Sequence, residues 1–160
     1  MPIEFIETGN QRLDGNGACI WKAPRYNFDT VFYDSTTFDN YDGIGIKLDN
    51  DTVLVDFDYH PEIGIEVLRR YPTLSVLTNR GIHLYYRKPN DYRGRIPAKS
   101  NVLTTCGALV DYKTGNRTMG TIKTDGELRN IKFMRTGKDG KVEMVENKFP
   151  NELSDLPEMP

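Results

Sequence analysis

The sequence predicts an α+β fold in which a mixed β-sheet carries helix packed on one of its faces. Residues 43–48 and 52–59 alternate apolar and polar side chains around the turn-forming run 49–51, a pattern typical of a β-hairpin. A helical segment follows at 60–71, and a second pair of strands and a further strand come after it. Strands and helix in this order predict one sheet with helix on one face and the other face left for a substrate.

Local signals support the helix. Pro61 suits its first position and Glu62 its first turn. Arg69 and Arg70 suit the last turn, where they match the helix dipole, and Pro72 ends the segment.

The remaining strands are predicted from turn chemistry and alternation. Residues 75–78 and 82–87 form the second pair around an Asn-Arg-Gly turn, and 107–113 form the further strand. The first forty residues are rich in Gly, Asn and Asp, and they predict irregular structure with short strands.

Length and composition fit one globular domain. The chain has 160 residues, of which 38% are hydrophobic and 28% charged. It contains no apolar run of about 18 residues and no secretion signal at its start, so we expect a cytoplasmic protein without a membrane partner. Its two cysteines lie far apart, which argues against a zinc site built on thiolates.

Charge is unevenly distributed along the chain. Residues 1–66 hold 4 basic and 13 acidic side chains, whereas residues 80–117 hold 8 basic and 2 acidic ones. Such segregation is typical of a polyanion-binding face beside a metal-binding carboxylate cluster. A chance cluster on a solvated loop is the alternative.

Asp56 and Asp58 carry the strongest chemical signal. Alternation along the strand 52–59 places its apolar side chains on the core face and both carboxylates on the opposite face, with Cα atoms roughly 6.6 Å apart. The carboxylates repel each other unless a cation lies between them, and Mg²⁺ and Mn²⁺ take oxygen ligands. We interpret the pair as a metal platform; a solvated acidic strand face is the alternative. His60 extends the same face, but its place before Pro61 favours a local capping role.

His83 is a candidate phosphate ligand. It lies on the polar face of the strand 82–87, after a turn that carries Arg80 and a tight Gly81. An ordinary structural histidine is an equally good interpretation of this residue alone.

Asp111 and Lys113 share one face of the strand 107–113. Alone they would form an ion pair of little energetic consequence. With the first carboxylate pair, Asp111 completes a centre for two Mg²⁺ or Mn²⁺ ions, and Lys113 adds a phosphate contact beside Arg80 and His83. The chain has no G-x-x-x-x-G-K-[ST] motif, which excludes a P-loop enzyme.

In their order along the chain, V-L-V-D-F-D, R-G-I-H-L-Y-Y and L-V-D-Y-K-T-G resemble the three motifs of the archaeo-eukaryotic primase superfamily. They are most similar to the bifunctional primase-polymerase domains of phages and plasmids, over about residues 40–120. One position departs from the pattern: many relatives carry a serine two residues before the histidine, where this chain has Gly81.

The resemblance implies an RRM-like catalytic sheet, in a catalytic domain that we place at 1–148, with an acidic, Pro-containing linker or chain end at 149–160. It implies template-dependent nucleotidyl transfer, as a DNA primase, a DNA polymerase or both, in phage or plasmid replication in the host cytoplasm. The implied partners are nucleoside triphosphates, single-stranded DNA template and primer, and a helicase domain on the same or another chain. The implied metal ligands are Asp56, Asp58 and Asp111, and the implied phosphate ligands are Arg80, His83 and Lys113.

Two other functions stay open. Carboxylate clusters with a lysine also serve two-metal nucleases, and a catalytically silent nucleic-acid-binding module of replication is a third interpretation. Dependence on nucleoside triphosphates separates the polymerase from the nuclease.

The loop 89–101 joins the histidine strand to the Asp111 strand. Because it combines basic side chains with an aromatic ring, we predict that it holds the template or primer strand. A solvated connector is the alternative. The candidate nucleic-acid-binding residues in this loop are Tyr92, Arg93, Arg95 and Lys99.

Overall fold

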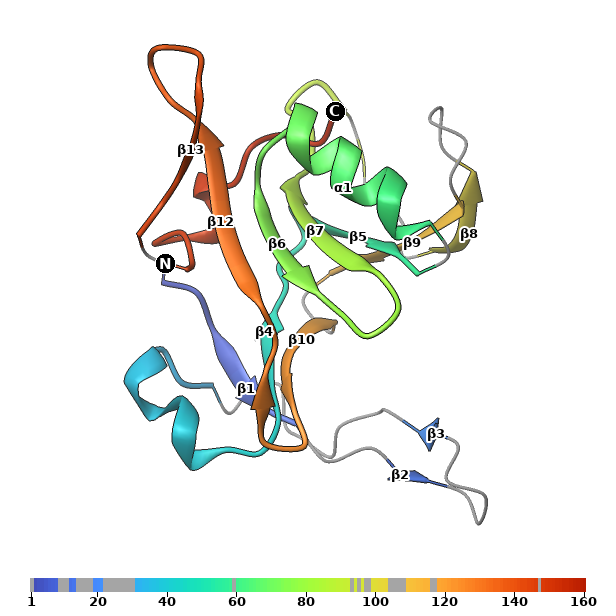
Figure 1. Cartoon of the computed structure of the whole chain (residues 1–160), viewed down its shortest axis with the longest axis vertical. Coiled ribbons are helices and arrows are strands. Elements are labelled where there is room, and N and C mark those ends of the chain that lie inside the picture. The colour runs from blue at the N-terminus through green and yellow to red at the C-terminus, as the bar shows by residue number, and fades with distance from the viewer. Residues whose placement is uncertain are drawn as a thin grey trace.

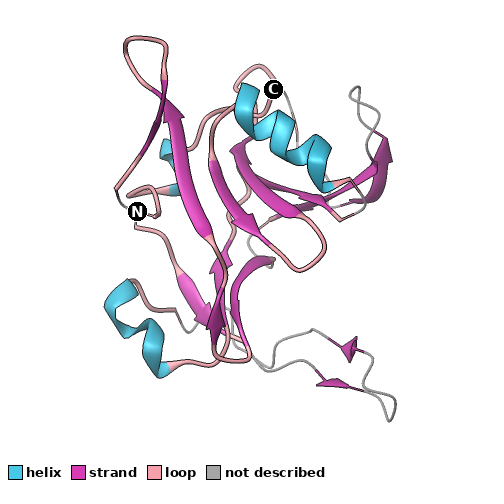
Figure 2. Ribbon diagram, in the orientation of Figure 1, coloured by secondary structure: helices cyan, strands magenta, loops and turns pink. Residues whose placement is uncertain are grey.

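The computed structural model describes residues 2–8, 12–13, 19–21, 31–58, 60–92, 94, 96, 99–103, 109–115, 118–146 and 148–160 (Figure 1). One α-helix, two 3-10 helices and short strands make up the secondary structure of this part of the chain (Figure 2). In chain order the elements are β1 (Phe5–Glu7), β2 (Arg12–Leu13), β3 (Cys19–Trp21), η1 (Ser35–Asn40), β4 (Ile44–Lys47), β5 (Thr52–Phe57), α1 (Pro61–Arg70), β6 (Leu74–Leu77), β7 (Ile82–Arg87), β8 (Lys99–Leu103), β9 (Leu109–Thr114), β10 (Met119–Thr124), β11 (Glu127–Leu128), β12 (Ile131–Thr136), β13 (Val142–Met144) and η2 (Leu153–Asp155).

The largest sheet has seven strands in the order β13-β12-β6-β7-β5-β9-β8, and its neighbours pair antiparallel. β5 and β6 therefore run in the same direction with β7 inserted between them, and α1 makes the connection. This is a split β-α-β unit. The α+β class, the helix and the β6/β7 pair are confirmed. The expected mixed sheet is wrong for the described strands, where the only parallel contact is an isolated bridge from Arg87 to Glu158.

Helix α1 packs on one face of this sheet (Figure 1). Gly64 allows the close approach, since a Cβ there would lie 2.5 Å from Cγ2 of Ile82. Glu66 pairs with Arg69 at 2.7 Å and Arg70 at 3.2 Å, which supports the last turn. The predicted core face of β5 is confirmed over the described residues, and Tyr59 lies outside them. The strand residues buried in this layer are Val53, Val55, Phe57, Ile82, Leu84, Tyr86 and Val110, joined by Ile96 from the stretch before β8; the helix contributes the partly buried Ile63, Val67 and Leu68.

A second sheet, in the order β1-β4-β10-β11, covers much of the opposite face. Leu54 and Tyr85 point away from α1, yet both are fully buried in the core between the two sheets. The expectation that this whole face is left for a substrate is therefore wrong. Apolar side chains on that face need cover, and the second sheet provides it.

The predicted hairpin of residues 43–48 with 52–59 is also wrong. β4 pairs with β1 and β10, whereas β5 pairs with β7 and β9. The turn between the two strands does form, because Oδ1 of Asp49 accepts hydrogen bonds from the Asp51 N–H and the Thr52 hydroxyl. Long-range packing decides which sheet each of the two strands joins. Gly45 fits β4 against β10, since a Cβ there would lie 2.1 Å from Sδ of Met119.

The C-terminal segment packs onto the domain instead of leaving it as the linker expected at 149–160. Leu153 and Leu156 are buried in the core between the sheets, and Phe149 packs against it. The Arg87 N–H donates to the Pro157 carbonyl, and the Met159 N–H donates to the Arg87 carbonyl, both at 2.8 Å. Acidic composition therefore misled the sequence interpretation, because the few apolar residues of the segment determine its packing.

Among the described residues, no helix is both long and apolar enough to cross a membrane.

Candidate functional site

Three polar side chains form one row across the centre of the seven-stranded sheet. Asp56 of β5 lies opposite Asp111 of β9 on one side and opposite His83 of β7 on the other. The row exists because β5 has both neighbours in antiparallel register. Residues from three separate sequence motifs thus become adjacent.

Asp58 completes a cluster of three carboxylates. It follows the last residue of β5, and one oxygen each from Asp56, Asp58 and Asp111 lie within 4.8 Å of one another. Asp56 is 7% exposed, whereas the other two are half-buried. The structure thus brings together the three carboxylates singled out from the sequence.

The cluster carries electrostatic strain. Burial alone would raise the pKa of Asp56, but the hydrogen bond and charge of His83, a hydrogen bond with Asp58 and the charge of Lys113 outweigh it and lower that pKa. Burial raises the pKa of Asp58, and its hydrogen bond with Asp56 and the Asp56 charge raise it further. Asp56 is therefore the ionised member of the pair, and Asp58 holds a proton more readily than an ordinary aspartate.

The donor set fits a divalent cation. Oδ1 of Asp56 is buried and has no hydrogen-bond partner among the described residues, while Oδ2 lies 3.4 Å from Nε2 of His83. A buried acceptor without a partner, beside two more carboxylates, is suited to a hard ion that takes oxygen ligands. His83 is itself 6% exposed, and its Nδ1 also lacks a partner in the described structure.

A cleft of about 750 Å³ opens beside this cluster. Asp56 and Asp58 lie in its wall, and Arg80, His83 and Lys113 line it too. The three phosphate-binding candidates therefore share one cavity with two of the three carboxylates, and Asp111 lies next to it through its contact with Asp56. Arg80 is exposed on the turn between β6 and β7, and Lys113 lies on β9 opposite Leu54.

Arg129 is a cleft residue that the sequence interpretation missed. It follows β11, lines the cleft, and donates from its guanidinium to the Thr121 carbonyl at 3.0 Å. Burial lowers the pKa of Arg129, while interactions with Tyr85, Asp56 and Asp58 oppose that shift. No motif marks this arginine in the sequence. The pairing of β10 with β4 and the hairpin of β10 with β11 bring it to the cleft.

His60 takes no part in the cluster. It is the residue before the first turn of α1, yet its side chain makes no capping hydrogen bond. Its Nδ1 lies 3.4 Å from a carboxylate oxygen of Glu62, and the side chain is exposed. His60 thus stands at the N-cap position, in line with the expected local capping role, and it caps through its backbone carbonyl, which accepts from the N–H groups of Ile63 and Gly64.

The candidate nucleic-acid-binding loop is described only in part. Tyr92 is 46% exposed, and Lys99 begins β8, so the predicted loop 89–101 ends in a strand beside β9. Arg93, Arg95 and the side chain of Lys99 lie outside the described residues.

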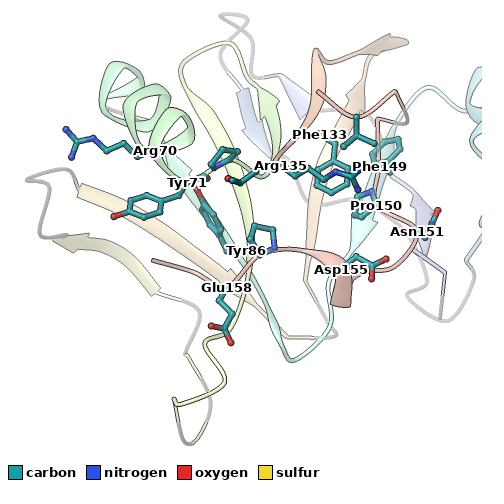
Figure 3. A pocket seen from close by; sticks show the side chains of 14 residues that line it. Arg70, Tyr71, Tyr86, Phe133, Arg135, Phe149, Pro150, Asn151, Asp155 and Glu158 are labelled. Carbon is teal, nitrogen blue, oxygen red and sulfur yellow. Dashed lines mark hydrogen bonds between the residues drawn. The ribbon is translucent and has the colours of Figure 1, made fainter. Parts of the chain in front are cut away.

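A second hollow of about 690 Å³ lies away from the carboxylates, between the end of α1, β12 and the C-terminal segment (Figure 3). Arg70 and Arg135 lie in its wall. Arg70 pairs with Glu66 of the same helix, and Arg135 of β12 pairs with Glu143 of β13. Tyr86, Phe133 and Phe149 supply aromatic lining. None of the three clustered carboxylates reaches this hollow, so we place the chemistry in the cleft beside Asp56.

Comparisons with protein-family models, with curated proteins and with solved structures give no match for this chain.

Proposed function

We propose that this chain is the catalytic domain of a template-dependent nucleotidyltransferase, acting as a DNA primase, a DNA polymerase or both. One observation carries the proposal: three carboxylates from two adjacent strands meet beside a cleft that also holds three basic side chains. Carboxylates for metal and cations for a polyphosphate are the two requirements of phosphoryl transfer by two metal ions. The split β-α-β unit agrees with the RRM-like sheet that the motif resemblance implies.

The clustered carboxylates and the basic side chains of the cleft have separate roles in this proposal. Asp56, Asp58 and Asp111 would hold two Mg²⁺ or Mn²⁺ ions, which supply Lewis-acid charge at the attacking 3′-hydroxyl and the leaving pyrophosphate. His83 places Nε2 3.4 Å from Oδ2 of Asp56 and would orient that carboxylate, and as a residue of the cleft wall it is also proposed as a phosphate ligand. The triphosphate would be neutralised by Arg80, Lys113 and Arg129.

Single-stranded template and primer would approach along β8 and the stretch before it. β8 is the immediate neighbour of β9, which carries Asp111, and Lys99 pairs with Tyr112. Tyr92 offers an exposed ring on which a base can stack. Arg93, Arg95 and Lys99 complete the proposed strand-binding segment.

The wider setting is proposed from the motif resemblance. It comprises a cytoplasmic role in phage or plasmid replication, with a helicase domain on the same or another chain as partner.

The test is a strand-synthesis assay on a primed and an unprimed single-stranded template. Each reaction contains Mg²⁺ or Mn²⁺ and either ribo- or deoxynucleoside triphosphates, with a nucleotide-free reaction alongside. Lengthening that requires triphosphates and metal supports the proposal. Shortening of the strand without triphosphates indicates a nuclease, and strand binding with neither reaction indicates a silent module.

Two variants make the assay specific to the site. Asp56→Asn should abolish synthesis, because it removes the central carboxylate of the cluster. Asp51→Asn is the matched control, since that aspartate is exposed on the turn before β5 and pairs with Lys88 at 3.8 Å. Asp51→Asn should keep wild-type activity.

A further inference from the structure

Thr78 lines the cleft in a fixed position. It is the residue after β6, and it opens the turn that leads into β7. Its N–H donates to the Gly81 carbonyl, and its Oγ1 accepts from the Gly81 N–H, both at 2.9 Å. These two bonds hold the hydroxyl at the cleft wall, where Arg80 and His83 also lie.

The Thr78 hydroxyl is still able to donate a hydrogen bond. A hydroxyl offers one O–H donor and two acceptor lone pairs, and the Gly81 N–H uses one of the lone pairs. Among the described residues the O–H has no acceptor. The turn therefore presents a hydrogen-bond donor, with its oxygen already fixed, to whatever enters the cleft.

Position 81 cannot hold a serine that would supply this hydroxyl, because a side chain does not fit there. A Cβ at that position would lie 1.8 Å from the Phe57 carbonyl oxygen and 3.1 Å from Cα of Asp58. Both contacts are with backbone, which side-chain movement cannot relieve. Gly81 therefore lies close against the backbone of Phe57 at the end of β5. This close approach holds Thr78 at a fixed place relative to the clustered carboxylates. Among the four residues of the turn, 78–81, Thr78 alone has a hydroxyl.

We propose that Thr78 is a phosphate-binding residue of the nucleotide site, donating its hydroxyl proton to a non-bridging oxygen of the triphosphate. The inference rests on the proposed function and adds to it a neutral donor beside Arg80, Lys113 and Arg129. A hydrogen bond from a hydroxyl to a charged phosphate oxygen is short and strong compared with one between neutral groups. This hydrogen bond would favour binding of the triphosphate of any nucleotide, because it does not involve the base.

The test compares nucleotide affinity of the whole chain with Thr78→Val and Thr78→Ser, using a nucleoside triphosphate with Mn²⁺. Valine keeps the shape of threonine and removes the hydroxyl, so affinity should fall roughly tenfold, while serine should keep it. In strand synthesis the loss should appear in KM for the nucleotide, with kcat and template affinity nearly unchanged. Affinity for the free nucleoside should be the same in all three proteins.

A further variant separates phosphate binding from turn stability, because valine also leaves the Gly81 N–H without its acceptor. Thr78→Asn is neutral and supplies both a side-chain oxygen for that N–H and a donor of its own, so it should bind the triphosphate several times more tightly than Thr78→Val. A melting temperature that recovers in Thr78→Asn while affinity stays at the Thr78→Val level would overturn the inference.

The outcomes are distinguishable. If the wild-type chain neither binds nor incorporates triphosphates, the proposed function fails and the inference with it. If the wild type does so and Thr78→Val matches it in affinity with only a lower melting temperature, the inference alone is overturned and Thr78 is a structural turn residue.

Discussion

At the scale of single residues, the site combines two carboxylates directly opposite each other with a third at the strand end. Like charges opposite each other on neighbouring strands destabilise a sheet. The raised pKa of Asp58, caused by its burial and by the neighbouring Asp56, shows that the fold disfavours its ionised form. The charge of Asp58 therefore reduces fold stability at the place where a cation would restore it.

Asp58→Asn should raise the melting temperature of the metal-free protein. The amide keeps the shape of the side chain and removes one of the mutually repelling charges, a gain on the order of 0.5 kcal/mol for a contact open to solvent. The same variant should lose most of the stabilisation that Mn²⁺ gives the wild type. Thermal unfolding with and without Mn²⁺ measures both effects, and an unchanged metal response would show that Asp58 is no ligand.

Tyr85→Phe should leave stability unchanged or raise it by about 1 kcal/mol. The Tyr85 hydroxyl is completely buried and has no hydrogen-bond partner among the described residues, so phenylalanine removes an unsatisfied group. A Cβ at Gly120 would lie 1.9 Å from that hydroxyl oxygen. Gly120→Ala should therefore cost about 1–3 kcal/mol, and less in the Tyr85→Phe background. Urea unfolding of the four proteins gives the coupling, and purely additive effects would contradict this contact.

At the scale of elements, the decisive contact is that of the β6–β7 turn with the end of β5. It places Thr78 and Arg80 beside Asp56 and Asp58. In the sheet order β6-β7-β5-β9, His83 of β7 and Lys113 of β9 then lie on the two sides of β5. β5, β7 and β9 each contribute one or two functional side chains, and the turn after β6 adds Thr78 and Arg80, so the site depends on correct pairing of all four strands.

Gly81→Ser should lower the free energy of unfolding, although many relatives in the superfamily that this chain resembles carry serine here. The new Cβ meets the Phe57 carbonyl, and relief requires the turn to move away from β5, at a cost of about 2–3 kcal/mol. Gly81→Ala has the same Cβ without the hydroxyl, so its free energy of unfolding should fall by the same amount. Denaturant unfolding and nucleotide affinity are the measurements. A serine variant with wild-type stability and tighter nucleotide binding would refute the close contact.

Neutralising Arg93, Arg95 and Lys99 together should weaken single-strand binding and flatten its salt dependence by roughly two units. Each contact with a phosphate contributes a slope of ~0.7 on single strands. Nucleotide affinity without template should barely change. Fluorescence anisotropy across a salt series measures the slope, and an unchanged slope would make the segment a connector between β7 and β9.

At the scale of the whole molecule, three layers account for the fold: α1, the seven-stranded sheet and the four-stranded sheet. The core between the sheets also takes in Leu153 and Leu156 from the C-terminal segment. The cleft lies where the second sheet stops covering the first, with Thr121, Thr124 and Arg129 on one wall.

Leu156→Ala should destabilise the domain by about 2–5 kcal/mol, because Leu156 is 2% exposed and the smaller side chain leaves a cavity. Met144→Ala is the control. Met144 is 62% exposed on β13, and its truncation should change stability by no more than about 0.5 kcal/mol. The turnover number of the folded fraction should be the same in both variants. A near-neutral Leu156→Ala in urea unfolding would mean that the C-terminal segment behaves as a linker after all.

Much of the site was predictable from local pattern, for a physical reason. Alternation along a strand fixes which side chains share a face, so the common face of Asp56 and Asp58 and the core face of Val53 and Val55 follow from the sequence alone. Helix α1 follows in the same way from Pro61, the charges at its two ends and Pro72. These features depend on neighbours within a few positions of the chain.

Only the tertiary structure decided how the strands pair. The sequence suggested that β4 would pair with β5, whereas β4 joins β1 and β10 in another sheet. That choice depends on burying Ile44 and Ile46 against Leu54 and on contacts far apart in the chain, which no local pattern encodes. The same pairing brings Arg129 to the cleft. The chemistry of each motif was thus determined locally, while the surroundings that make it one site came from long-range packing.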